Sequence, residues 1–157
     1  MRKIFMVTAA LCVLVATASA QSKVSGTAQC SKPDTQQMVA VGDRPDHNMG
    51  VAQQKCTWTK PMEIGGVKSK DGVSSATLDS SGGTEHSRGM HVATMQSGDK
   101  FFAWYAGFGT SKEVKGNWGF SGGSGKLKGL KGKGTYTCTP SGEGITCEVE
   151  GEYQLAK

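Results

Sequence analysis

The sequence predicts an all-β protein that folds as a single closed antiparallel β-barrel of about eight strands, stapled by disulfides. Short segments of alternating apolar and polar residues recur between turn-forming residues, and no stretch shows a long helical period. Such a series of strands without crossover helices is typical of a barrel or a sandwich. Eight of the 23 glycines lie between Gly116 and Tyr136. Barrel closure needs glycine at corners and close strand approaches, so this density agrees with a barrel.

Residues 1–20 have the pattern of a cleaved secretory leader, which leaves residues 21–157 as one domain. Arg2 and Lys3 precede an apolar run from Ile4 to Ala16, and a small-residue cleavage box follows at residues 18–20. The alternative is a buried core strand. The run is too short to span a bilayer stably. We therefore expect a protein exported to the periplasm or the medium, with no membrane insertion after cleavage.

The last two strand candidates form the clearest hairpin. The segment after Gly129 and the segment from Ile145 to Leu155 alternate strictly and flank a turn-forming cluster at residues 139–144. When Cys138 is placed opposite Cys147, Tyr136 faces Val149 and Lys133 faces Glu152, so both faces agree in one register. The hairpin therefore predicts a Cys138–Cys147 disulfide.

Four cysteines remain after the leader, and an even number in an exported chain predicts two disulfides. With Cys138 and Cys147 paired, Cys30 pairs with Cys56. The alternative, a zinc site, lacks a closely spaced cysteine pair or a neighbouring histidine.

A second hairpin is expected from Met90 to Gln96 and from Phe101 to Phe108, around a turn at residues 97–100. Pairing across this turn places Met95 opposite Phe102, Ala93 opposite Trp104 and His91 opposite Ala106. Phe102, Trp104 and Phe108 would then share an inner face with aromatic residues of the next strand. The predicted cavity residues are Trp104, Trp118, Phe102, Phe120 and His91.

Earlier in the chain, further strands are expected at residues 24–30, 38–42, 51–59 and 74–80, with Pro61 ending the third. Residues 81–87 are expected to form a polar loop.

The segment GGSGKLKGLKG, residues 122–132, resembles the GGTG-x-aromatic-x-G-x-x-G signature of the dirigent and allene oxide cyclase-like barrels. Ser124 replaces the threonine and Leu127 replaces the aromatic residue. The resemblance implies an eight-stranded antiparallel barrel with an apolar central cavity. It concerns fold only, because the cavity residues on which the chemistry of those families depends lie outside this motif.

Two polar groups of residues are candidates for chemistry. Asp46 and His47, in the loop of residues 43–49, could contribute to a metal site, but aspartate, asparagine and proline are also common turn residues. We expect a turn, and no metal or other cofactor. His91 with Glu85 could act as an acid or base in a cavity enzyme. The favoured alternative is a histidine that caps the core, since no nucleophile or metal partner accompanies it.

Lysines 126, 128, 131 and 133 form a basic surface, but nucleotide and nucleic-acid binding are not expected. The P-loop pattern fails at Phe120 and at Leu127. The net charge of +5 falls to +3 without the leader, and glutamates oppose the lysines across the last hairpin. A solvated face explains these lysines.

The sequence favours a non-catalytic binder of a small apolar or amphipathic ligand. Two alternatives stay open: a cavity enzyme of cyclase or isomerase type, and an exported inhibitor or interaction module that acts through its loops. An open cavity would favour the first two over the third, which needs only a packed barrel. The sequence does not identify the ligand or the oligomeric state.

Overall fold

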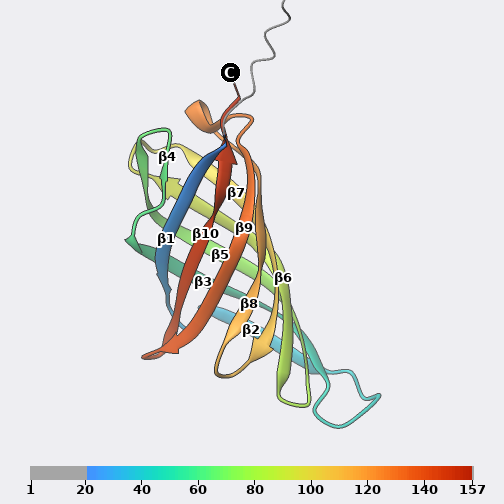
Figure 1. The fold of residues 1–157 in the computed structure, drawn as a ribbon. Helices are drawn as coiled ribbons and strands as arrows, with labels where there is room; N and C mark the ends of the chain where they lie inside the picture. Colours follow the sequence, from blue (N-terminus) through green and yellow to red (C-terminus); the bar gives the residue numbers. More distant parts are fainter. Residues whose placement is uncertain (1–20, 157) are drawn as a thin grey trace, which may run out of the picture.

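The computed structural model describes residues 21–156, which fold as a β-barrel with one short 3-10 turn (Figure 1). The predicted leader lies outside these residues. No helix among them is long and apolar enough to cross a membrane. The elements are β1 (Ser22–Cys30), β2 (Thr35–Ala40), β3 (Asn48–Lys60), β4 (Glu63–Ile64), β5 (Val67–Ser81), β6 (Thr84–Met95), β7 (Lys100–Thr110), β8 (Val114–Gly123), η1 (Gly125–Leu127), β9 (Lys131–Ser141) and β10 (Gly144–Gln154).

Eight antiparallel strands close the barrel, which confirms the predicted fold class. The order around the barrel is β1-β10-β9-β8-β7-β6-β5-β3, and β3 returns to β1. β1 therefore pairs with the last strand on one side and with β3 on the other. Each of the eight strands of this ring therefore has a partner strand on both sides.

Two further strands extend the barrel at opposite ends. β2 pairs with the Asn48–Gln53 part of β3, on the edge that β1 contacts farther along, at Cys56–Lys60. β4 pairs with the start of β5 at the other end, where η1 also lies (Figure 1). As predicted, Pro61 directly follows the end of β3. β2 and β4 thus lengthen the wall without entering the ring of eight strands.

The register predicted for the last hairpin is confirmed. Cys138 lies opposite Cys147, Tyr136 opposite Val149, and Lys133 opposite Glu152. Gly134 shows why this strand needs glycine: a Cβ there would collide with the Glu150 carbonyl oxygen of the neighbouring strand. The close approach of β9 and β10 thus accounts for part of the glycine-rich stretch.

The register predicted for the β6–β7 hairpin is wrong by three residues. Ala93 lies opposite Phe101 rather than Trp104, and His91 lies opposite Ala103 rather than Ala106. A shift by an odd number of residues exchanges the two faces of a strand. The phenylalanine and tryptophan side chains that were assigned to the interior therefore point outward. The pattern could not decide this register because both faces of β7 carry aromatic residues. Phe102, Trp104 and Phe108 are exterior; Phe101 and Tyr105 are interior.

The polar loop predicted for residues 81–87 is much shorter in the structure. β5 runs to Ser81 and β6 begins at Thr84, so only Gly82 and Gly83 lie between the strands. Both glycines have positive φ angles, of 60° and 78°, which suits a two-residue hairpin turn. The polar residues that follow this turn, from Thr84 to Ser87, belong to β6, and Thr84, Glu85 and Ser87 line the cavity.

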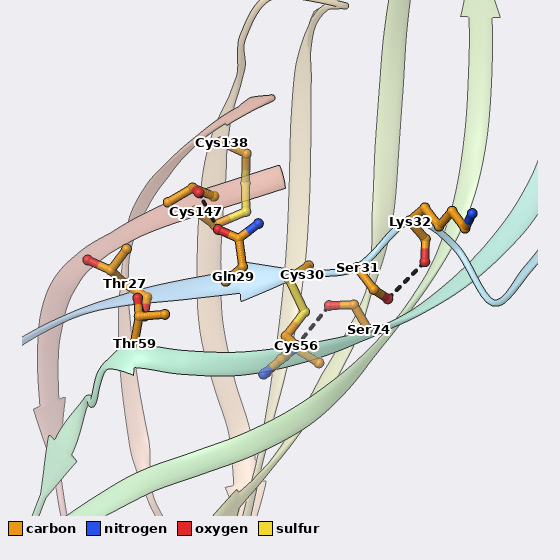
Figure 2. The surroundings of a disulfide bond; sticks show 12 residues. Thr27, Gln29, Cys30, Ser31, Lys32, Cys56, Thr59, Ser74, Cys138 and Cys147 are labelled. Carbon is orange, nitrogen blue, oxygen red and sulfur yellow. Dashed lines mark hydrogen bonds between the residues drawn. A yellow bond between two sulfur atoms is a disulfide. The ribbon is translucent and has the colours of Figure 1, made fainter. Parts of the chain in front are cut away.

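Both predicted disulfides are present, Cys30–Cys56 between β1 and β3 and Cys138–Cys147 between β9 and β10 (Figure 2). Each joins residues that are directly opposite in neighbouring strands. Because β1 and β10 also pair, the two bridges flank the seam where the first and last strands meet. The disulfides therefore hold the strands whose pairing closes the barrel.

The barrel is packed solid at the end that carries β4 and η1. The most deeply buried large side chains gather there: Phe101, Met62, Ile64, Met95 and Leu130. Leu127 of η1 is also buried and covers this end. The packed end supplies much of the hydrophobic stabilisation, which leaves the other end free to hold a cavity.

We expect loss of either disulfide to destabilise the protein, with the larger effect for Cys30–Cys56. The bridged residues are 26 and 9 positions apart. The chain-entropy relation then gives about 3.5 and about 2.6 kcal/mol. Urea unfolding of the paired Cys→Ala variants measures both losses. Equal stability of both variants and the oxidised wild type would contradict a stapling role.

Candidate functional site

The inward side chains leave a cavity of about 610 Å³ in the half of the barrel opposite β4 and η1. Residues of two hairpin turns line it, among them Ser81, Gly83 and Ser111, so it opens at the end where these turns lie. Pockets for small molecules typically measure about 300–1,000 Å³. The cavity is therefore large enough for one small ligand.

Aromatic rings form the inner part of the cavity. Phe101 packs against Phe120 at a centroid distance of 5.2 Å and against Trp58 at 6.4 Å, while Trp118 and Phe120 are 4.8 Å apart. The Trp118 indole N–H donates to the carbonyl oxygens of Thr135, at 3.1 Å, and Glu150, at 3.2 Å. These interactions fix the rings and create a rigid apolar floor.

His91 of β6 lies beside this floor. Its Nδ1 is 2.9 Å from the Ser74 hydroxyl of β5, and its ring centroid is 6.0 Å from that of Trp58. Burial lowers the pKa of His91 from 6.5 to about 4. The imidazole is therefore neutral at pH 7.

Tyr105 and Tyr136 form the middle of the cavity wall. Their ring centroids are 6.1 Å apart and the rings are nearly perpendicular, at 87°. Gly107 makes room for the Tyr136 hydroxyl, since a Cβ at that position would collide with it. Burial raises the pKa of both phenols. The pKa of Tyr105 is raised to about 12, mainly by burial, and the nearby Tyr136 and Glu85 add to this rise. Both side chains are therefore neutral at pH 7.

Two polar atoms in the cavity wall, Trp58 Nε1 and His91 Nε2, are buried without a hydrogen-bond partner among residues 21–156. A buried polar atom of this kind costs about 1–3 kcal/mol, and such atoms are uncommon in folded proteins. The wall therefore has hydrogen-bonding capacity that the described protein atoms do not use.

All charged side chains in the described cavity lining are acidic: Asp46, Glu85 and Glu113. Glu113 forms an ion pair with Lys115 at 2.8 Å. Glu85 is half-buried on the inner face of β6, and burial raises its pKa above the usual 4.5. No ion pair within the described part of the chain includes Glu85.

Four of the five predicted cavity residues belong to the lining: Trp104, Trp118, Phe120 and His91. Trp104 touches the lining, but 43% of the residue is exposed and its ring covers Gly119 on the outer face. Phe102 is not part of the lining, because the register of β7 turns it outward. Contact of these residues with a ligand stays a prediction.

His91 and Glu85, the candidate acid–base pair, do not lie together. Both side chains face inward from β6, but six positions separate them, or about 20 Å along an extended strand. His91 belongs to the floor and Glu85 to the mouth. The neighbour that orients His91 is instead Ser74.

The loop before β3 is built around an ion-pair network. His47 contacts a carboxylate on each side, Asp43 through Nδ1 and Asp79 through Nε2 at 3.1 Å. The hydrogen bond to His47 is the main reason that the pKa of Asp43 is lowered. Asp46 lies outside this network and adopts a positive φ of 60°, as turn residues do. Within the described chain no group of three histidine, cysteine or carboxylate side chains is arranged to hold a metal.

Sequence reasoning missed several wall residues, although a signal for some was present. Trp58 lies two positions from Cys56, and Tyr136 two positions from Cys138. Both disulfides line the cavity, so residues at even spacing from a cysteine on the same strand also face inward. Tyr105 and Phe101 carried no such marker, because β7 has no cysteine.

Comparison with known proteins supports the fold but not an activity. No family model and no curated protein matches the sequence. A solved protein of unknown function from Shewanella oneidensis MR-1, of the DUF3224 family, aligns over 88% of this chain and 99% of its own with a TM-score of 0.55 and 16% identity. A structure described as pyocyanin demethylase aligns over 81% and 98%, at 13% identity, but its TM-score of 0.47 is too low to support an inference. The first similarity shows a shared barrel fold.

We expect acid to destabilise the wild type more than a His91→Gln variant. The unfolded state binds a proton at His91 below pH 6.5, whereas the folded state does so only near pH 4. Stability is therefore lost as the pH falls from 6.5 to 4, by about 3 kcal/mol at 1.36 kcal/mol per pKa unit. Urea unfolding at pH 7.5, 6.5, 5.5 and 4.5 measures this loss. Parallel profiles for the two proteins would show that His91 is not buried in its neutral form.

Proposed function

We propose that the protein is an exported, non-catalytic binding protein that holds one small apolar or amphipathic molecule in its barrel. The observation that supports this proposal is the open cavity of about 610 Å³, which has an aromatic floor and a polar mouth. Eight-stranded barrels have an interior wide enough for one small ligand when the side chains do not fill it. Burial of apolar surface against the floor would supply most of the affinity.

Export is part of the proposal and is supported by the two disulfides, which form and persist in oxidising compartments. Kinship with the dirigent and allene oxide cyclase-like barrels is also a proposal. Its support is the glycine-rich motif at residues 122–132 together with the closed eight-stranded barrel.

The open cavity favours a binder or a cavity enzyme over the module with a packed barrel. Between those two, the separation of His91 from Glu85 removes the pair that would have supported acid–base chemistry. His91 remains a neutral imidazole beside the floor, so turnover lost in a His91→Ala variant would revive the enzyme hypothesis.

We expect the neutral dye Nile red to bind to the purified protein with enhanced fluorescence, and Ala52→Phe to weaken this binding at least tenfold. Ala52 faces the cavity from β3, so a phenyl ring there occupies ligand space. Native mass spectrometry of the same preparation should show a 1:1 complex. Ala76→Phe provides a second variant, since Ala76 lies directly opposite Ala52 on the neighbouring strand β5 and also lines the cavity.

Ala106→Phe is the matched control, because the same ring is added on the exposed outer face of β7. Its dissociation constant should stay within twofold of the wild type. Equal binding by all three variants would place the dye outside the barrel, and absence of binding to the folded wild type would contradict the proposed function.

Export predicts that the full chain, expressed in a Gram-negative host, is recovered from the periplasm with Gln21 as its first residue. Intact-mass analysis and non-reducing peptide mapping check the cleavage site and both disulfides. Recovery of an uncleaved cytoplasmic protein with reduced cysteines would contradict export.

A further inference from the structure

Charge in the cavity is opposite in sign to the charge of the whole chain. The protein has a formal net charge of +5, yet the described cavity lining contains three carboxylates and neither lysine nor arginine. Two cations that lie near the mouth are already paired: Lys115 with Glu113, and Arg44 with Asp43 at 2.8 Å. An anionic ligand would therefore find no free cationic side chain in this lining.

Glu85 is the carboxylate best placed to act on a ligand. It projects inward from β6 and is half-buried. None of the ion pairs found within residues 21–156 includes it. Next to it on the inner face of β6 lies Ser87, and the neighbouring strand carries Gly107, which the Tyr136 hydroxyl covers. A partly desolvated carboxylate without a partner attracts a cation more strongly than an exposed one does.

Aromatic rings line the cavity between Glu85 and the floor, since Tyr105 lies four positions along β7 from Gly109, the residue opposite Glu85. Tyr105 and Tyr136, the perpendicular pair, both line the cavity, and Trp118 lies opposite Tyr105 on β8. Ring faces attract organic cations, and this attraction is strongest where water is excluded. The carboxylate and the rings therefore favour the same kind of charge.

Taking these observations together, we infer that the cavity selects flat aromatic molecules that carry a single positive charge. The charged end lies at Glu85, between the mouth and the tyrosine pair, and the apolar body extends toward the floor formed by Trp118 and Phe120. This inference rests on the proposed function, since it assigns a ligand class to the same cavity. Hydrophobic burial supplies affinity and Glu85 supplies the charge preference.

The test uses three probes of similar size at pH 8: N-methylquinolinium, a permanent cation; quinoline, neutral at this pH; and 2-naphthoate, an anion. Titration calorimetry on the mature, disulfide-bonded protein gives each dissociation constant. We expect the cation to bind about tenfold more tightly than quinoline, and the anion to bind more weakly than quinoline. Glu85→Gln should remove the tenfold preference and leave quinoline binding within twofold.

Glu148→Gln is the matched control, because it removes the same charge from the exposed outer face of β10 and should keep the preference. Equal binding of cation and quinoline, or tightest binding of the anion, would overturn the charge inference and leave the binding function intact. Loss of preference in both variants would show that overall charge, not Glu85, selects the ligand. If neither these probes nor Nile red binds, the proposed function itself fails.

Discussion

Pairing of β1 with both β10 and β3 is the constraint on which the rest of the structure depends. Without it the sheet would be an open ribbon with two long edges, and its inner side chains would face water instead of one another. Closure gives every strand an inside and an outside, and it confines the inward residues of eight strands to one lumen. The cavity exists only because the first and last described strands meet.

Closure alone does not explain why the lumen is filled at one end and open at the other. Side-chain size does. At the packed end the inward or covering residues are large, such as Met62, Ile64 and Leu130, and their burial is nearly complete. Toward the mouth the inward positions of β3 and β5 carry small residues, such as Ala52 and Ala76. The same ring of strands therefore encloses a core at one end and space at the other.

The fold could be predicted because it depends on information that is local in the sequence. The cysteines of the last hairpin and the strict alternation around them fix one register, and the structure has that register. The site was harder to predict because it depends on which face of each strand points inward. In β3 and β9 a disulfide-bonded cysteine shows which face points inward. In β7 aromatic residues occupy both faces, so only the geometry of the β6–β7 turn determines which face points inward. Phe102 was assigned to the cavity for this reason, and Phe101 and Tyr105 were overlooked.

The open half of the barrel lowers the stability of the fold, and this explains the location of the disulfides. Small inward residues give up packing that larger ones would provide, and Trp58 and His91 each bury a polar atom without a partner in the described chain. Both bridges lie in the wall of this same half, on the two sides of the closing seam. Each bridge limits the freedom of the unfolded chain and so offsets stability that the cavity forfeits. The protein can thus keep its lumen accessible at one end, because disulfide bonds stabilise that end and a packed hydrophobic core stabilises the other.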